Sequence, residues 1–313
     1  MIPALVLTAG LGTRLRPLSF VRAKGALPVA GEPLGRRILR WLGSNGVTDA
    51  VLNLHHLPHT LTSAIGDGTD LGMRVRYSWE VPVLGSAGGP KRAVPLIGRS
   101  PFLIVNGDTL TDVSLKEVID DHARSGALVT MAVVPNNEPD KYGGIVVDQG
   151  GSVSGFVRRG SPQPSFHFIG VQVAAADAFA SVPVNTPYES VGTLYPALIA
   201  GTPGAIRAFR APAEFLDIGT PADYLSTALR IADREGRANV GLRAQIAADA
   251  RVERSVLWDD VIVENGAFLK ACIVTDGARV PADTSWHGVT LRVAAGELAP
   301  GERRIGDLAI ASL

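Results

Sequence analysis

The feature that most limits how this chain can fold is a six-residue repeat near its carboxyl end. From Ala248 the sequence divides into ADARVE, RSVLWD, DVIVEN, GAFLKA, CIVTDG and ARVPAD. The third residue of every unit is apolar: Ala250, Val256, Ile262, Phe268, Val274 and Val280. A period of six with an inward apolar residue is typical of a parallel β-helix, in which each repeat forms one side of a triangular coil. The repeats therefore predict about two coils, and an antiparallel hairpin sheet is the alternative.

The first two thirds of the chain have another pattern, in which short apolar segments alternate with helix-like ones. The predicted strands are Ala4–Thr8, Ala50–Leu54, Val75–Trp79, Phe102–Val105 and Leu128–Val134. The predicted helices are Pro33–Asn45, Ser114–Arg124 and Pro221–Asp233. This alternation indicates a mostly parallel, Rossmann-like sheet covered on both faces. The predicted fold class is α/β, with a Rossmann-like domain over residues 1–237 and a short left-handed parallel β-helix over residues 238–313.

The composition excludes several classes of protein. The chain has 313 residues, 46% of them hydrophobic, and 30 Lys and Arg residues balance 30 Asp and Glu residues. This balance gives no reason to expect a nucleic acid or an acidic membrane surface as partner. The single cysteine, Cys272, excludes an internal disulfide framework, and no apolar run reaches the roughly 18 residues of a membrane span. We expect a soluble, cytoplasmic protein.

The segment Thr8–Lys24, TAGLGTRLRPLSFVRAK, places glycines and basic residues directly after the first predicted strand. Ligands of open parallel sheets bind at the carboxyl ends of the strands, and such a turn is suited to hold a phosphate. A Walker A loop is excluded because GxxxxGK[ST] is absent. The dinucleotide fingerprint GxGxxG is incomplete because Leu15 occupies the place of its third glycine. A purely structural turn is the remaining alternative.

Six motifs in order resemble the sugar nucleotidyltransferase family. LTAGLGTRLRPLSFVRAKGALPVAGEPL resembles the opening signature of that family, and VNGD (Val105–Asp108) and FLDIGTPADYL (Phe215–Leu225) resemble its two aspartate motifs. LGSAGGPKRA (Leu84–Ala93) resembles the segment that approaches the base. KYGGIVVD (Lys141–Asp148) and FIGVQV (Phe168–Val173) resemble the segment that lines the sugar pocket and the strand after it. The resemblance extends from residue 2 to about residue 235, and a hexapeptide-repeat tail is common in this family.

The resemblance implies that residues 1–237 transfer a nucleotidyl group from a nucleoside triphosphate to a sugar 1-phosphate and release pyrophosphate. Glu80 and the LGSAGG form favour a guanylyltransferase that uses GTP and mannose 1-phosphate, or a related hexose or heptose phosphate. One alternative is a uridylyl- or thymidylyltransferase acting on glucose 1-phosphate or an amino-sugar 1-phosphate. Another is a catalytically silent relative that binds nucleotide-sugars as a regulator. A Rossmann oxidoreductase is disfavoured because the fingerprint is incomplete.

The resemblance also implies roles for single residues. Asp108 and Asp217 would bind Mg²⁺, although each aspartate could instead cap a following helix. Arg14 would contact the β- and γ-phosphates, and Lys24 the α-phosphate or the sugar phosphate. These four are the expected catalytic residues. The other expected nucleotide-binding residues are Ala9, Gly10, Gly12, Thr13, Gly85, Ala87, Gly88 and Asn106, and the expected sugar-phosphate-binding residues are Gly143, Gly144, Arg159 and Gly170.

Three positions depart from the family pattern. Ser19 stands where the family has Thr, Ala23 where it usually has Pro, and Arg158 where it commonly has an acidic residue that faces the sugar. Because Arg158 cannot accept hydrogen bonds from sugar hydroxyls, either another residue contacts the sugar or the sugar is unusual. We interpret Arg16 and Arg22 as peripheral charges.

The repeat tail exposes strand edges and contains or adjoins Trp258, Phe268 and Trp286. Unpaired edges and aromatic side chains favour contacts with another surface. We therefore expect residues from about 240 onward to pack against the catalytic domain or to support a homo-oligomer, without supplying a catalytic group.

Overall fold

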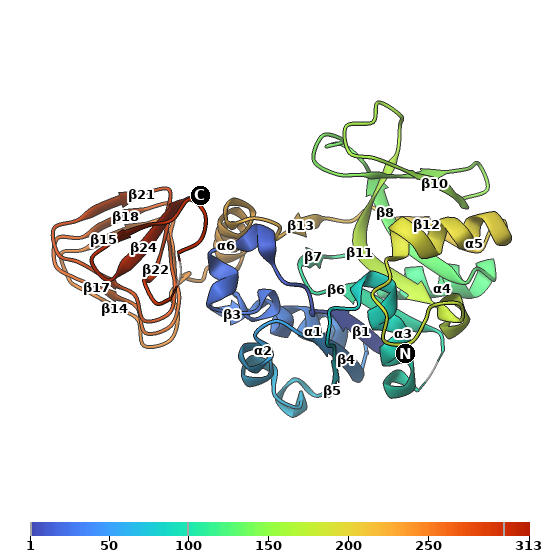
Figure 1. Cartoon of the computed structure of the whole chain (residues 1–313), viewed down its shortest axis with the longest axis horizontal. Coiled ribbons are helices and arrows are strands. Elements are labelled where there is room, and N and C mark those ends of the chain that lie inside the picture. The colour runs from blue at the N-terminus through green and yellow to red at the C-terminus, as the bar shows by residue number, and fades with distance from the viewer. Residues whose placement is uncertain (1, 99, 297) are drawn as a thin grey trace. The chain divides into compact units, whose positions relative to one another are not determined.

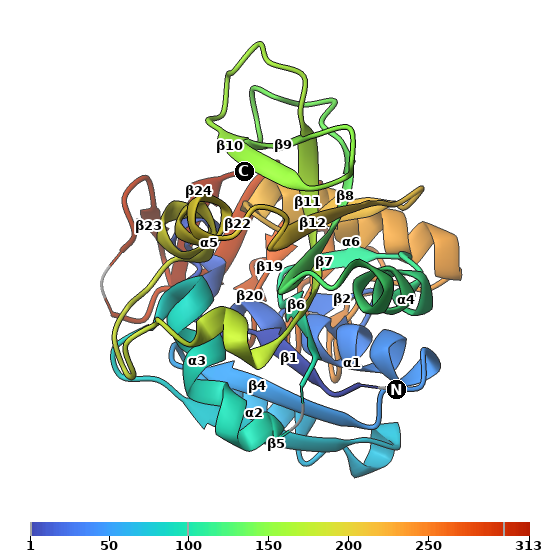
Figure 2. The same cartoon turned by 90° about the vertical axis from the view of Figure 1, so that its right-hand side faces the viewer.

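The computed structural model describes residues 2–98, 100–296 and 298–313 (Figures 1 and 2). Its internal contacts divide the chain into two units. Unit 1 consists of Met1–Gly10, Ile38–His56 and Ile65–Leu216, and unit 2 of Leu11–Arg37, Leu57–Ala64 and Asp217–Leu313. The predicted boundary between residues 237 and 238 lies inside unit 2 and stays a prediction about which part of the chain folds independently.

Unit 1 is built on a nine-stranded sheet with the order β10-β9-β11-β6-β1-β4-β5, in which β8 pairs with β11 and β12 pairs with β8. β1 is parallel to β4 and β6, β4 to β5, and β8 to β12, whereas β11 is antiparallel to its neighbours. The strands are β1 (Ala4–Leu7), β4 (Asp49–Leu54), β5 (Arg74–Trp79), β6 (Phe102–Asn106), β8 (Val129–Pro135), β9 (Gly144–Val147), β10 (Val153–Val157), β11 (Phe166–Ala174) and β12 (Ile206–Arg210). The predicted Rossmann-like α/β class is confirmed, and each of the five predicted strands begins and ends within one residue of its expected bounds.

The helices are α1 (Leu34–Ser44), α2 (Pro58–Ile65), α3 (Gly85–Ile97), α4 (Leu115–Ser125), α5 (Tyr195–Gly201) and α6 (Pro221–Glu235). The three predicted helices correspond to α1, α4 and α6. Helix α3 was not predicted from the sequence, because it contains Pro90 and Pro95 and proline removes a helical hydrogen bond. Its Ala87 and Ala93 pack in the same core as Leu5 of β1 and Val51 of β4. In the described ranges, no helix has the length and apolar character that a bilayer crossing requires.

Within unit 2, the repeat tail forms parallel sheets with the orders β14-β17-β20, β15-β18-β21 and β16-β19-β22, coloured orange to red in Figure 1. The strands are β14 (Gln245–Ile246), β15 (Arg251–Glu253), β16 (Val256–Leu257), β17 (Ile262–Val263), β18 (Phe268–Lys270), β19 (Ile273–Val274), β20 (Arg279–Val280), β21 (Ser285–His287) and β22 (Val289–Val293). The predicted parallel β-helix is confirmed. An antiparallel addition of β24 (Leu308–Ser312) and β23 (Arg303–Ile305) follows β22.

The inward positions of the β-helix differ in part from the predicted ones. Val274 and Val280 are buried as predicted, but Ile262 and Phe268 are only partly buried, and their neighbours Val263 and Leu269 occupy the core. The reason is the coil length. Strand residues pair with residues 17 positions further on, as in Gln245 with Ile262 and Ile262 with Arg279. A strict period of six therefore loses its register by one residue in each coil.

Trp258 is fully buried, and its indole nitrogen donates to the Tyr224 hydroxyl of α6 at 2.9 Å. The tail thus packs on α6 through this side chain, as expected for contact with the preceding domain. Since Trp258 is enclosed within unit 2, it cannot line an interface with another copy, whereas Phe268 and Trp286 are half-buried.

Candidate functional site

A buried hydrogen-bond network joins the carboxyl ends of β1, β4 and β5 in unit 1. The backbone nitrogens of Thr8 and Ala9 donate to Asn53 Oδ1, at 2.6 and 3.2 Å. Asn53 Nδ2 donates to Glu80 Oε1 at 2.8 Å, and Glu80 Oε2 accepts from the Leu84 backbone nitrogen at 2.9 Å. Asn53 and Glu80 are 3% and 1% exposed. The network fixes both the start of the predicted phosphate turn and the start of the LGSAGG segment.

Glu80 therefore has a structural role, and the base preference that its resemblance to guanylyltransferases indicated stays a prediction. Both carboxylate oxygens accept hydrogen bonds from inside unit 1. A Cβ atom on Gly89 would lie only 2.7 Å from Glu80 Oε1, so the protein encloses the carboxylate closely. Neither Asn53 nor this role of Glu80 was predicted, because a polar residue near a strand end is common in loops of every kind.

Asp108 follows β6 and lies at the end of β1. The Gly107 nitrogen donates to the Leu7 carbonyl at 2.9 Å, and a Cβ atom on Gly107 would lie 2.5 Å from the same oxygen. The glycine of VNGD is therefore required for the chain to approach β1 this closely. The next helix, α4, is capped by Ser114, whose side chain accepts from the Glu117 nitrogen. The alternative of Asp108 as the cap of this helix is thus wrong.

Gly143, Gly144 and Arg159 come together where β9 pairs with β10. Gly144 is opposite Val157 in this antiparallel pair. A Cβ atom on Gly143 would lie 3.2 Å from the Val157 carbonyl oxygen and 3.9 Å from the Arg159 nitrogen. Gly170 belongs to a separate contact, because a Cβ atom there would lie 3.0 Å from Asn106 Cβ. Their sugar-phosphate role stays a prediction.

Gly85, Ala87 and Gly88 form the start of α3. The nitrogens of Ala87 and Gly88 donate to the Tyr188 carbonyl, at 2.9 and 3.1 Å. A Cβ atom on Gly88 would lie 2.5 Å from the Thr186 carbonyl oxygen, and Gly85 has a φ of 75° that favours glycine. These small residues thus allow a close chain approach within unit 1. Their predicted contact with the nucleotide stays a prediction.

In unit 2, Arg14 and Asp217 both lie beside Gly219. A Cβ atom on Gly219 would lie 2.9 Å from Asp217 Oδ2 and 3.3 Å from Arg14 Nη1. The following helix, α6, is capped by Thr220, whose hydroxyl accepts from the Asp223 nitrogen at 3.1 Å. Asp217 is therefore not the helix cap, and that alternative is also wrong. A carboxylate and a guanidinium thus both lie close to Gly219.

The glycine turn of the opening signature is held by Ser19. Gly12 has a φ of 60°, and its carbonyl accepts from the Ser19 hydroxyl at 2.8 Å. Ser19 is 1% exposed, so this hydroxyl is part of the interior. The residue that replaces the family threonine thus fixes the turn. Thr13 and Arg14 follow on a short 3₁₀ helix, Thr13–Leu15, and are exposed.

The change from Pro to Ala at position 23 has a structural counterpart. The Ala23 nitrogen donates to Thr60 Oγ1 at 3.0 Å, a bond that proline could not make because it has no N–H. Lys24 begins the 3₁₀ helix Lys24–Ala26 directly after this bond. The neighbouring Arg22 is not a peripheral charge, since its side chain is only 16% exposed and forms an ion pair with Asp276. Arg16, by contrast, is exposed.

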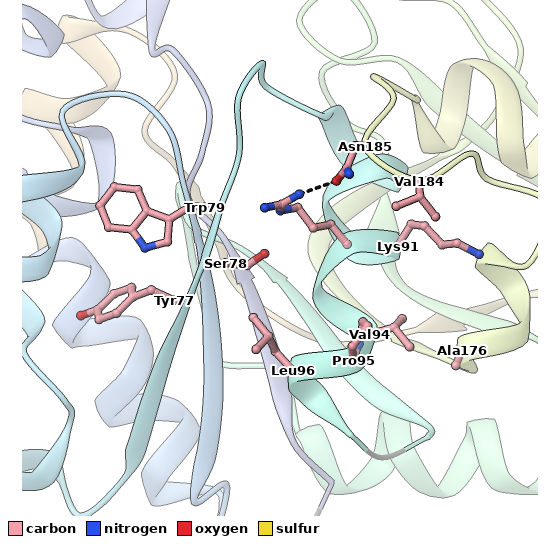
Figure 3. A pocket seen from close by; sticks show the side chains of 11 residues that line it. Tyr77, Ser78, Trp79, Lys91, Val94, Pro95, Leu96, Ala176, Val184 and Asn185 are labelled. Atoms are coloured by element: carbon pink, nitrogen blue, oxygen red, sulfur yellow. Dashed lines mark hydrogen bonds between the residues drawn. The ribbon is translucent and has the colours of Figure 1, made fainter.

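No group of three or more His, Cys, Asp and Glu side chains is arranged to hold a metal ion in the described ranges. Unit 1 also contains a hollow of about 630 Å³ (Figure 3). Tyr77 and Trp79 of β5 line one side of it, and Lys91 and Arg92 of α3 another, with Arg92 hydrogen-bonded to Asn185. None of the predicted site residues lines this hollow.

The chain is similar to a known protein family, to characterised relatives and to solved structures. The family model "Nucleotidyl transferase" matches residues 3–234. The mannose-1-phosphate guanylyltransferase of Mycobacterium tuberculosis is 27% identical over 298 residues, which cover 86% of this chain and 83% of that protein. The UTP–glucose-1-phosphate uridylyltransferase of Synechocystis is 26% identical over 298 residues, which cover 88% of this chain and 76% of that protein. The crystal structure of HddC from Yersinia pseudotuberculosis complexed with GMP-PN has a TM-score of 0.65 at 24% identity, over 74% of this chain and 100% of that one.

The family match includes the opening signature, the VNGD motif and the FLDIGT motif, and it ends before the repeats. The solved structure shows the same fold. The chain therefore belongs to the nucleotidyl transferase family.

Proposed function

We propose that this protein transfers a nucleotidyl group from GTP to mannose 1-phosphate, or to a related hexose or heptose 1-phosphate, and releases pyrophosphate. The observation that carries the proposal is the position of the opening signature and both aspartate motifs within the matched residues 3–234. The local geometry supports it, because neither aspartate is used as a helix cap and Arg14 lies beside the same glycine as Asp217.

The reaction forms one bond and breaks one bond at the α-phosphorus. An oxygen of the sugar phosphate attacks in line, and the bond from the α-phosphorus to the bridging oxygen of the β-phosphate breaks. Pyrophosphate leaves with the electron pair. Because two anions must approach and the leaving group gains negative charge, the protein has to supply positioned cations and hydrogen-bond donors.

Arg14 and Lys24 are the cations that we assign to this task. Arg14 binds the β- and γ-phosphates, since its planar guanidinium can donate two parallel hydrogen bonds to a phosphate. Lys24 binds the α-phosphate or the sugar phosphate as a compact charge. Ala9, Gly10, Gly12 and Thr13 supply the turn between them and β1.

We assign Mg²⁺ to Asp108 and Asp217. Mg²⁺ is commonly bound by one or two carboxylates together with phosphate oxygens and water, and these two hard oxygen donors fit that preference. When bound, the ion supplies positive charge next to the phosphate oxygens. The protein's part is to hold each carboxylate, and Gly107 of VNGD lets the chain before Asp108 approach β1 closely.

The choice of GTP rests on relatives that carry the name mannose-1-phosphate guanylyltransferase. A uridylyltransferase is the second candidate, favoured by the relative from Synechocystis. A homo-oligomer formed through the β-helix is a further part of the proposal, with the half-buried Phe268 and Trp286 as its support.

Pyrophosphate release with a panel of triphosphates and sugar 1-phosphates tests the proposal. With Mg²⁺ present, we expect the fastest release with GTP and mannose 1-phosphate, and loss of release on adding EDTA. A higher rate with UTP and glucose 1-phosphate would support the second candidate. No release with any pair would contradict the enzyme and support a silent relative.

A further inference from the structure

We propose that Arg22, Asp259 and Asp276 are positioning residues, which hold the segment 22–28 and thereby aim Lys24. The inference rests on the proposed function of Lys24 as a phosphate-binding group. We assign none of the three residues a contact with the substrate. They act through the backbone that precedes Lys24, and two of them, Asp259 and Asp276, belong to the β-helix.

Arg22 is fixed by two carboxylates at once. Its Nε and Nη2 donate to the two oxygens of Asp276, at 2.7 and 2.6 Å, and Nη2 also donates to Asp259 Oδ2 at 2.6 Å. The side chain of Arg22 is 16% exposed, that of Asp276 29% and that of Asp259 24%. The guanidinium also lies 5.4 Å from the centroid of the buried Trp258 ring. Such a bidentate, charge-assisted contact defines the orientation of the side chain as well as its position.

The two carboxylates are themselves placed by the β-helix. Asp259 and Asp276 occupy equivalent positions of successive coils, 17 residues apart, and the Asp259 nitrogen donates to Asp276 Oδ1 at 3.1 Å. Asp259 Oδ1 accepts from the Leu242 nitrogen at 2.7 Å. Burial raises the pKa of Asp276, Arg22 opposes this shift, and the neighbouring charge of Asp259 adds to it. Two stacked carboxylates repel each other, and Arg22 is the cation between them.

The other end of the segment is held by a separate hydrogen bond. The Pro28 carbonyl accepts from the Tyr224 hydroxyl at 2.5 Å, and this hydroxyl accepts from Trp258 at 2.9 Å. Tyr224 and Trp258 are fully buried. The segment is thus fixed at three positions: at Arg22 by its ion pair, at Ala23 by the hydrogen bond to Thr60, and at Pro28 by the hydrogen bond from Tyr224. Lys24 lies between these points, so its direction depends on them.

The first part of the test measures turnover in the full-length protein. Asp259→Asn/Asp276→Asn and Arg22→Gln should each lower kcat by about 10- to 100-fold, with little change in KM for the triphosphate, because a small misplacement of a catalytic group costs rate. Arg22→Lys, which keeps the charge without the planar fork, should recover part of the loss. Asp260→Asn is the matched control on the β-helix. It removes an exposed pair with Arg243 and should leave kcat unchanged.

The second part combines these changes with Lys24→Ala. If the ion pair acts through Lys24, Asp276→Asn should lower kcat further by less than about twofold in the Lys24→Ala background, since coupled residues are not additive. Equal losses in both backgrounds would overturn the inference, as would unchanged kcat in a folded Arg22→Gln variant. If the double aspartate variant does not fold, the single variants Arg22→Lys and Asp276→Asn are used instead, and the test is again whether their loss of kcat is smaller in the Lys24→Ala background. Unchanged turnover of Lys24→Ala itself would instead contradict the proposed function.

Discussion

The two turns that carry the predicted site residues are held in different ways. In unit 1, Asn53 and Glu80 join neighbouring strand ends. Asn53 is 45 positions from its partner Thr8 and 27 positions from its partner Glu80. In unit 2, Arg22 reaches Asp276, which is 254 positions away in the β-helix. The first turn is thus supported by its own sheet, and the second by an element that the family match does not include. We infer from this ion pair that the repeat tail contributes to the proposed reaction without touching the substrate.

The two supports also differ in what they cost when broken. Asn53 and Glu80 are almost fully enclosed, so removing one partner leaves a buried polar group without a hydrogen bond. The Arg22 pair is partly exposed, and water can replace some of its bonds. We therefore expect changes in the first network to appear mainly as lost stability, and changes in the second mainly as lost turnover.

The largest effect is expected for Asp108→Asn and Asp217→Asn, one substitution in each unit. Each removes a carboxylate charge from the proposed Mg²⁺ ligands and should lower turnover by about 10³-fold or more, with little change in the melting temperature. Pyrophosphate release and thermal unfolding measure the two quantities. Near-normal turnover of either variant at saturating Mg²⁺ would mean that the substituted aspartate is not a metal ligand.

Lys24→Ala and Arg14→Ala should have the next largest effects. Lys24→Ala should lower kcat by about 10²- to 10³-fold, as expected for one charge donor at a developing negative charge. Arg14→Ala should in addition raise KM for the triphosphate, because Arg14 is assigned to the phosphates of the leaving group. Steady-state kinetics separate the two patterns. Wild-type kinetics in both variants would leave the opening segment a structural turn.

Glu80→Gln tests the support in unit 1. The amide cannot accept from both Asn53 and the Leu84 nitrogen, so one buried donor loses its partner, and we expect about 1–3 kcal/mol of lost stability. Turnover of the folded variant should fall by less than about tenfold. Chemical unfolding measures the first quantity, with Asp120→Asn on α4 as control because its pair with Lys116 is exposed. A loss of turnover without a loss of stability would reverse the contrast between the two units.

The smallest effect is expected for Asp260→Asn. The pair of Arg243 and Asp260 has nearly the same length as the Arg22 contact, at 2.6 Å, but its side chains are 66% and 52% exposed. Water and salt screen exposed pairs, so removing this one should leave the free energy of unfolding nearly unchanged. Unfolding curves of the variant and the parent should nearly overlap. A large loss of stability would show that solvent exposure does not explain the difference between the Arg243–Asp260 pair and the Arg22 pair.

Much of the architecture could be predicted because it depends on short-range patterns. The strands Ala4–Leu7 and Phe102–Asn106 are apolar runs, and Ser114 marks the start of its helix three residues before Glu117. The helix α3 was missed because Pro90 and Pro95 oppose helical propensity locally, while core packing of the helix prevails. The coil length was missed because the register is set by pairing across coils and not within one repeat.

The candidate site could be predicted only in part. The glycines of VNGD and DIGT are visible as motifs, but the backbone contact that requires Gly107 and the side chains that lie beside Gly219 are not. The role of Arg22 could not be predicted, because its partners are more than 230 residues away and nothing local distinguishes it from a solvated charge. Long-range pairing, more than residue type, decided which charges have a structural task.

Hydrogen–deuterium exchange of the full-length Asp259→Asn/Asp276→Asn variant tests the central claim most directly. We expect faster exchange in peptides covering residues 22–28, where the Ala26 and Leu27 nitrogens donate to the carbonyls of Ala23 and Lys24. Peptides covering the Ala87 and Gly88 nitrogens, which are bonded to Tyr188 inside unit 1, should exchange as in the parent. Unchanged exchange over residues 22–28, or an equal increase in both regions, would contradict the claim that the β-helix holds the opening segment.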